Sequence, residues 1–353
     1  MKRWVTGSIA GAAIGASLAQ VMGRRAQARA IDAFYGSGGP PQRVVVDGRE
    51  MWLPIVIHRM DGFGSLHAAS MAAARELLPS DELRPVSLPR DRAAVLITAF
   101  RYYEMTDSRP APVEPAEPPY AEVTITILAT RGGRAPLLSP ALMGTGLAPT
   151  AGYVPHMAVT HRLARDGGRE LWGVPKFIAD VDFIDDVARR EVRLAEGEQH
   201  ILTLRLRPAG RLRTSTQPSV MYTVLDGSLI ETRMPSVYEV RTALGPGRGR
   251  LELGTDGHPV SETLRRLDVT PEPLGVLDSP VIRTMFVPGV AVGAGRRVVD
   301  YEGSDRASGR FTVRHPGTGP IDQNAALPLS AIWAAPDSAE RPAAEAREPA
   351  LMT

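Results

Sequence analysis

Short runs of β-branched and aromatic residues, separated by turn-forming residues, recur along most of the chain. In one run, Val123, Ile125 and Ile127 alternate with Thr124 and Thr126, and Leu and polar residues alternate in the same way over residues 202–207. A period of two indicates a strand with one buried face. We expect ten strands, at residues 43–46, 51–58, 93–103, 121–129, 152–161, 177–184, 190–196, 200–207, 221–225 and 237–244.

Two segments have a helical pattern. Residues 66–78 end before Pro79, and residues 259–267 begin with Pro259, which suits the first turn of a helix. Many strands with two helices predict a mainly β fold with a few helices (α+β). Because closure removes exposed edge strands, we expect the sheet to form a closed β-barrel or cone.

The two ends of the chain differ from this body in composition. Residues 4–23 carry no charged side chain and reach the length of a membrane span, so residues 1–32 predict a membrane anchor, a cleaved signal or a non-functional extension. Residues 302–353 are rich in Pro, Ala and charge, which predicts a disordered tail. One domain would occupy residues 33–301. We expect it to be cytoplasmic or tethered to a membrane through residues 4–23, with export by a signal peptide as the alternative.

Charge and composition exclude several classes of function. The chain has 41 basic and 39 acidic residues and no concentrated basic run, which argues against a nucleic-acid partner. It has no cysteine, which excludes disulfides, thiolate metal sites, iron–sulfur clusters and a cysteine nucleophile. Metal-binding histidine motifs, carboxylate clusters and phosphate loops are also missing from the sequence, so we expect neither a metal nor a cofactor.

Lysine is rare in this chain, which has 39 Arg and only two Lys, at positions 2 and 176. A lone interior Lys176 indicates a site that needs an amine able to lose its proton, although one neutral lysine could also have survived by chance. Pro175 restricts the backbone before it, and Trp172 and Phe177 place apolar groups around it, which disfavours a charged ammonium. Gly167 and Gly168 would permit a tight turn nearby. A neutral amine can attack a ketone and form a Schiff base.

The segment GRELWGVPKF (168–177) resembles the active-site segment of the acetoacetate decarboxylase family. Three other segments resemble that family in the same order along the chain. DGREMWLPIVIHR (47–59) is similar to its N-terminal strand, PPYAEV (118–123) to its Tyr-x-Glu motif, and GHPVSETLRRL (257–267) to its C-terminal helix. The resemblance spans roughly residues 43–301 and implies a closed barrel or cone.

The resemblance also implies roles for individual residues. Lys176 would form the Schiff base with a small β-keto or oxo acid, Arg49 would orient the substrate carboxylate, and Glu122 would position the substrate or transfer protons. The protein would then be a lyase and a homo-oligomer. We further expect Trp172, Phe177 and Tyr120 to line the substrate pocket, and Arg169, Glu170 and Pro175 to have structural roles beside it, with Arg169 and Glu170 forming an ion pair.

The chain departs from the family pattern at two positions. Phe177 stands where acetoacetate decarboxylases proper have a second lysine, and the strand before the proline-rich loop offers Thr98 in place of a second carboxylate, with Glu104 some residues later. These departures leave Schiff-base chemistry open but do not specify the reaction. Decarboxylation is our first hypothesis, and aldolase or dehydratase chemistry through the same Schiff base is the second. A non-catalytic barrel that binds small molecules is the third.

Overall fold

The structure is a computed structural model that describes residue 29 and residues 31–110, 119–132 and 151–323, apart from residues 187, 256, 305 and 316–319. The hydrophobic segment at residues 4–23 and the end of the chain from residue 324 lie outside the described residues, so the anchor, signal and terminal disorder stay predictions. Among the described residues, no helix combines the length and the apolar character needed to cross a membrane.

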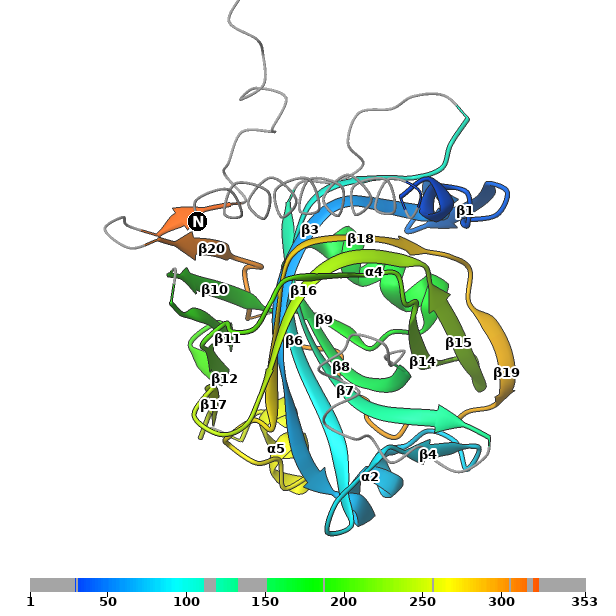
Figure 1. Cartoon of the computed structure of the whole chain (residues 1–353). Helices are drawn as coiled ribbons and strands as arrows, with labels where there is room; N and C mark the ends of the chain where they lie inside the picture. The colour runs from blue at the N-terminus through cyan, green and yellow to red at the C-terminus, as the bar shows by residue number, and fades with distance from the viewer. Residues whose placement is uncertain are drawn as a thin grey trace, which may run out of the picture.

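Most of the described strands belong to one large, strongly curved sheet (Figure 1). Its strands run in the order β13 (Arg213–Ser215), β16 (Ser236–Leu244), β18 (Gly275–Phe286), β3 (Ile55–Ser70), β6 (Arg92–Thr106), β7 (Tyr120–Arg131), β8 (Ala151–Val159), β14 (Ser219–Leu225), β15 (Ser228–Met234) and β19 (Val290–Ala294). Three short strands pair beside this path, namely β4 (Leu83–Pro85), β5 (Ser87–Leu88) and β9 (Lys176–Ile178).

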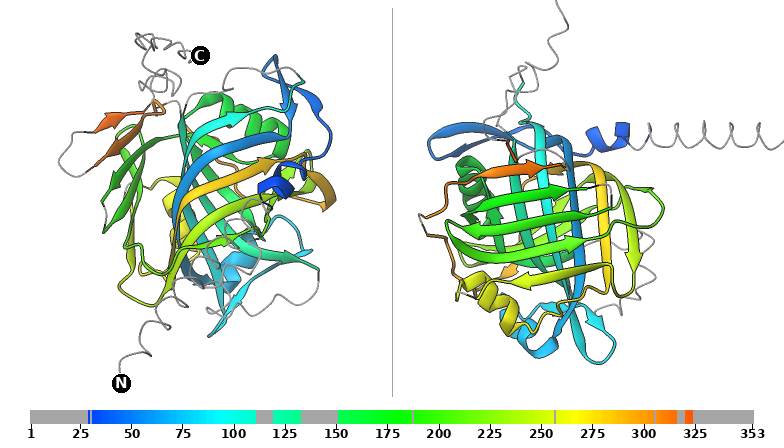
Figure 2. Two further views of the ribbon diagram at one scale, coloured as in Figure 1. Left: turned by 45° about the horizontal axis from the view of Figure 1, so that its top comes forward. Right: turned by 90° about the vertical axis from the view of Figure 1, so that its left-hand side faces the viewer.

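A smaller sheet crosses the convex face of the large one, as the right-hand view of Figure 2 shows. It contains β17 (Gly249–Leu253), β12 (Gln199–Leu206), β11 (Arg190–Glu196), β10 (Asp180–Asp185), β20 (Phe311–Arg314) and β21 (Ile321–Asp322). The hairpin of β1 (Gln42–Val46) and β2 (Arg49–Leu53) stands apart. Residues 31–35 are helical, and three further helices are α2 (Met71–Leu77), α4 (Arg162–Trp172) and α5 (Pro259–Arg266).

The main core fills the space between the two sheets. As the alternation predicts, Val123, Ile125 and Ile127 of β7 are buried in this core, together with leucines of β12 in the smaller sheet. Thr124 and Thr126 point to the other, concave face of the large sheet, where they line a cavity. Because side chains alternate along a strand, one face of β7 packs in the core and the other face lines the cavity.

The expected closed barrel is wrong, whereas the mainly β composition with few helices is confirmed. In the described part of the chain, the ladder of the large sheet ends at β13 and β19, and no strand pairing joins these two edges. Closure would require β15 to pair with β16, which follows it directly after Pro235. Instead, β19 pairs with residues 228–231 of β15 and β13 pairs with residues 238–240 of β16, so short strands occupy part of both edges without closing the sheet.

The helices and the C-terminal boundary also differ from the prediction. The expected helix at 66–78 begins only at Met71, because residues up to Ser70 pair with β6. Helix α5 begins at Pro259 as predicted, and the Nδ1 atom of His258 accepts a hydrogen bond from the Val260 amide at 3.2 Å. Helix α4 was not predicted, and neither were β15, β17, β18, β19 or β20. Strand β20 lies in the supposed tail, where Phe311 is completely buried.

Candidate active site

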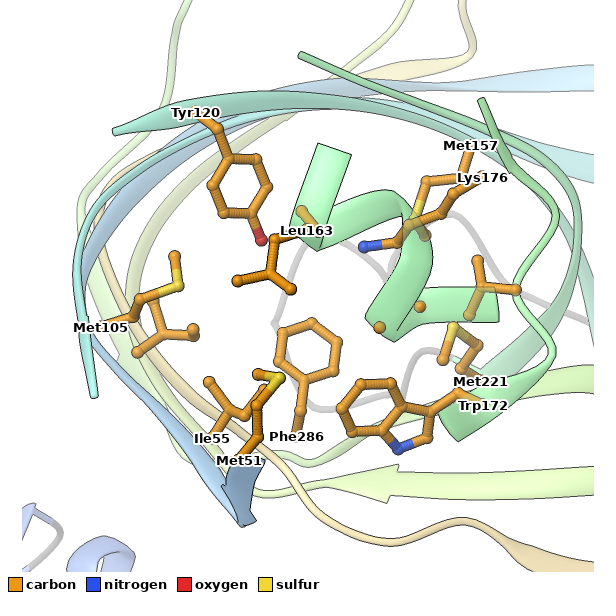
Figure 3. Close-up of a pocket in the computed structure, with 15 residues that line it drawn as sticks. Met51, Ile55, Met105, Tyr120, Met157, Leu163, Trp172, Lys176, Met221 and Phe286 are labelled. Carbon is orange, nitrogen blue, oxygen red and sulfur yellow. The ribbon is translucent and has the colours of Figure 1, made fainter. Parts of the chain in front are cut away.

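The end of helix α4, a tight turn and a short strand together position Lys176. Helix α4 ends at Gly173, which has a positive φ of 63°, and the chain then turns tightly at Pro175, where the Lys176 amide donates to the Val174 carbonyl at 2.7 Å. Strand β9 then pairs in parallel with β8, and Lys176 lies beside Met157. Residues that pair across strands project to the same face, so the Lys176 side chain points into the concave side of the large sheet (Figure 3).

The two glycines of α4 do not form the expected tight turn, because they lie inside the helix. A Cβ atom on Gly168 would lie 2.5 Å from Cδ and 2.7 Å from Cε of Lys176, closer than van der Waals contact permits. On Gly167, the nearest atom to a Cβ would be Cγ1 of Val46, at 4.0 Å. The missing side chain of Gly168 therefore provides the space through which the lysine chain reaches the pocket.

Lys176 and Glu122 form a buried pair. The Nζ atom of Lys176 donates to Oε2 of Glu122 at 3.0 Å, and the two side chains are only 7% and 3% exposed. The other carboxylate oxygen, Oε1, accepts from the hydroxyls of Tyr102 at 3.2 Å and Thr124 at 3.3 Å. Burial, followed by the charge of Glu122 and this hydrogen bond, raises the pKa of Tyr102, so the phenol remains a donor. Because these two hydroxyls bind Oε1, Oε2 is the oxygen that accepts from the Lys176 amine.

A small pocket of about 40 Å³ surrounds the amine, and apart from Lys176 its walls are largely apolar (Figure 3). Trp172 and Tyr120 line it, as expected from the sequence. The indole nitrogen of Trp172 donates to the Val287 carbonyl at 2.8 Å, and the Tyr120 ring stacks on Tyr102 with centroids 4.4 Å apart. The remaining walls are Met51, Ile55, Ile57, Met105, Met157, Leu163, Ala164, Gly167, Gly168, Val174, Met221 and Phe286.

A second, larger cavity of about 240 Å³ lies on the concave side of the large sheet. It shares Met157, Met221 and Phe286 with the pocket around the amine, so the two spaces adjoin. We call the pocket around the amine the outer pocket and this larger space the inner cavity. Glu122 belongs to the wall of the inner cavity, and Lys176 belongs to the wall of the outer pocket. The hydrogen-bonded pair therefore stands at the boundary between the two spaces.

Phe177 is not among the residues that line either cavity. Successive residues of a strand face opposite sides, so Phe177 follows Ala158 into the core between the sheets. Its ring lies 5.2 Å from that of Tyr301 and 6.1 Å from that of His258. Behind it, the buried carboxylate of Glu196 accepts from both the Tyr301 hydroxyl and, at 2.9 Å, His258. The residue at the position of the second family lysine thus contributes to the scaffold.

Arg49 lies at the exposed start of β2, and no contact in the described structure joins it to Lys176 or to Glu122. The charge of Arg49 acts on His161, whose pKa is lowered first by burial and then by this charge. The structure therefore brings together Lys176, Glu122, Tyr120 and Trp172, but it leaves Arg49 on the surface hairpin.

Arg169, Glu170 and Pro175 support the backbone around the site. The Nε atom of Arg169 donates to the carbonyl of Lys176 at 2.7 Å, and a terminal nitrogen donates to the Glu302 carbonyl at 2.8 Å. Glu170 accepts from the Asp47 amide at 3.4 Å, which ties the β1–β2 hairpin to α4. The two residues thus bind different neighbours and do not form the expected pair with each other. Tyr102 and the inner cavity were missed, since no local signal distinguishes a cavity-facing strand residue.

Comparison with known proteins points to one family. The family model described as "Acetoacetate decarboxylase (ADC)" matches residues 53–301. A crystal structure of acetoacetate decarboxylase from Legionella pneumophila subsp. pneumophila is similar in fold, with a TM-score of 0.50 at 15% identity, covering 68% of this chain and 88% of that one.

The enduracididine biosynthesis enzyme MppR, complexed with the condensation product of pyruvate and imidazole 4-carboxaldehyde, has a TM-score of 0.52 at 12% identity, covering 73% of this chain and 98% of that one. At these identities the likeness concerns the fold. No curated protein matches the chain. Among the described residues, no group of three His, Asp or Glu side chains could hold a metal ion.

Proposed function

Because the chain belongs to the acetoacetate decarboxylase family, we propose that it is a lyase in which Lys176 forms a Schiff base with an oxo acid. The observation that carries the proposal is the 3.0 Å contact between the amine of Lys176 and the carboxylate of Glu122, buried at an apolar pocket. A neighbouring base can activate an amine as a nucleophile by taking its proton, and Glu122 is hydrogen-bonded to Nζ of Lys176.

One proton transfer prepares both groups for the reaction. When the proton moves from Nζ of Lys176 to Oε2 of Glu122, the ammonium–carboxylate pair becomes an amine and a carboxylic acid. Neither arrangement carries net charge, so the transfer does not leave an isolated buried charge. The free electron pair on Nζ then attacks the carbonyl carbon, and the acid supplies a proton as the carbinolamine hydroxyl leaves as water.

The resulting iminium accepts electrons from the bond between the adjacent α-carbon and the substrate carboxylate. In a β-keto acid this bond breaks and carbon dioxide leaves, while its electron pair forms an enamine. Protonation of the enamine carbon and hydrolysis of the imine release the ketone and regenerate Lys176. The apolar walls favour this reaction, because a carboxylate that is poorly solvated becomes a neutral product. Aldol condensation or dehydration would start from the same iminium, and product analysis distinguishes these reactions.

Trapping with borohydride tests the nucleophile. We would incubate the protein with acetoacetate, and separately with pyruvate, in the presence of borohydride and locate the mass adduct by peptide mapping. We expect an adduct on Lys176 that is lost in Lys176→Arg, because a guanidinium is not a usable nucleophile. The chain has only one other lysine, so Lys2→Arg is the matched control and should keep the adduct. Equal labelling of Lys176→Arg and the wild-type protein would contradict the proposal.

A further inference from the structure

We infer that the substrate carries an apolar chain or ring of about six carbons or more, and that the inner cavity receives this group. The inference rests on the proposed function, because it places the reacting carbonyl at Lys176. Beyond the carbonyl held at the outer pocket of about 40 Å³, acetoacetate or pyruvate would present only a methyl group to the inner cavity. Most of the inner cavity of about 240 Å³ would then have no role in binding.

The position of the inner cavity connects it to the reacting atoms. Glu122 contacts the Lys176 amine at 3.0 Å and is part of the cavity wall. Met157, Met221 and Phe286 line both spaces. A group attached to the carbon bound by Lys176 can therefore pass between these three side chains into the inner cavity. Methionine side chains adapt their shape to such a group at small cost.

The volume of the cavity sets the size of the group. A cavity of about 150 Å³ in another protein, lined by apolar residues, holds benzene. At about 240 Å³, the inner cavity has room for more than a six-membered ring. This volume is larger than the methyl group of either acetoacetate or pyruvate would fill.

The described walls of the inner cavity disfavour a charged group in it. Among the described lining residues, Glu122 is the only one with a charged side chain, and neither Arg nor Lys lines the inner cavity. A substrate carboxylate in this cavity would meet neither Arg nor Lys among the described lining residues, and Glu122 would repel it. The apolar part of the wall includes Met60, Leu96, Phe100, Val154, Val220, Met234, Val240, Leu277 and Ile282.

Several hydroxyls in the wall are already bound to protein atoms. Ser236 and Thr284 share a hydrogen bond of 2.9 Å, Ser279 donates to the Glu239 carbonyl, and Thr124 donates to Glu122. These groups are satisfied without a ligand, so the substrate does not need a polar partner for each of them. Burial of methylene groups, rather than hydrogen bonding, therefore supplies most of the affinity in this cavity.

Methyl ketones of increasing length test the inference, because they carry no carboxylate and differ only in the apolar chain. We would measure the concentration of acetone, methyl propyl ketone, methyl pentyl ketone and methyl heptyl ketone that gives half-maximal borohydride trapping on Lys176. Each buried methylene should lower this concentration roughly fourfold until the cavity is full. A concentration that is equal for all four ketones, or lowest for acetone, would overturn the inference and leave Schiff-base formation intact. No adduct with any ketone would overturn both.

A filled cavity gives a second, independent measurement. Thr126→Phe places a ring in the inner cavity, and we expect the preference for methyl heptyl ketone over acetone to fall about sixteenfold, the equivalent of two methylenes. Thr214→Phe makes the same substitution at an exposed strand position outside both cavities and should keep the wild-type preference. An unchanged preference in folded Thr126→Phe would overturn the inference. If that variant does not fold, the wild-type series still decides.

Discussion

Lys176 and Phe177 are adjacent in the chain, yet their side chains lie in different compartments. Lys176 faces the concave side of the large sheet and reaches Glu122, whereas Phe177 packs in the core against Tyr301. The alternation of a strand has this effect at every pair of residues. In this structure, therefore, Glu122 is the hydrogen-bonded partner of the amine, and residue 177 belongs to the core packing on the opposite face of β9.

At the residue scale, Glu122→Gln should separate proton transfer from packing, because the amide keeps the size of the side chain but cannot accept the proton of Nζ. We expect the rate of adduct formation on Lys176 to fall about 10²–10⁴-fold, the usual contribution of a general acid–base group. A time course of borohydride trapping measures this rate. Glu104→Gln, an exposed change on β6, is the control and should trap at the wild-type rate. Wild-type trapping by Glu122→Gln would remove Glu122 from the mechanism.

At the scale of elements, helix α4 both makes room for the Lys176 side chain and holds the Lys176 backbone. A glycine in the middle of a helix costs about 1 kcal/mol relative to alanine, and α4 contains two of them. Gly168 is required because a Cβ atom there would overlap the chain of Lys176. The Nε atom of Arg169 then holds the Lys176 carbonyl at 2.7 Å, so consecutive residues of α4 make room for the lysine and fix its backbone.

Two alanine substitutions in α4 test this arrangement. Gly168→Ala should reduce trapping on Lys176 at least about tenfold by displacing the lysine, while the gain of about 1 kcal/mol in helix propensity offsets part of the crowding. Gly167→Ala has its nearest obstacle at 4.0 Å, so it should keep wild-type trapping and gain up to about 1 kcal/mol. Urea denaturation measures the free energy of unfolding for both variants. Equal trapping by the two variants would show that Gly168 does not make room for Lys176.

At the scale of the whole molecule, two buried histidines connect the packing to pH. Burial lowers the pKa of His67 to about 4 and that of His156 to about 3. His67 lies between the Ser65 hydroxyl and the Thr270 carbonyl, and His156 contacts the Thr263 hydroxyl of α5 at 2.9 Å. Both histidines therefore hold parts of the scaffold together in their neutral form.

The stability of the protein should fall as the pH is lowered from 7 to 5. The unfolded chain protonates these histidines near pH 6.5, whereas the folded chain does so only near pH 4 and pH 3, so the unfolded state binds more protons in this window. Each histidine should contribute a loss of about 2 kcal/mol by pH 5. Urea denaturation at both pH values measures the loss of stability, and His156→Gln should reduce that loss by about 2 kcal/mol. His315→Gln changes an exposed histidine and should leave the pH dependence of stability unchanged. A wild-type protein whose stability is the same at pH 7 and pH 5 would contradict the prediction.

The sequence by itself determined the family, most strands of the scaffold and the two residues of the buried pair. These features depend on local patterns: a period of two along β7, a lone lysine after Pro175, and motifs in a fixed order. The catalytic roles of Lys176 and Glu122 stay predictions until trapping is measured.

Only the tertiary structure decided that the large sheet stays open, that residues 162–172 form a helix over the site, and that Arg49 lies on the surface. It also showed the inner cavity, whose walls come from strands distant in sequence. These features depend on which strands pair and how far a sheet curves. Both are set by the packing of the whole chain, so no local pattern of residues encodes them.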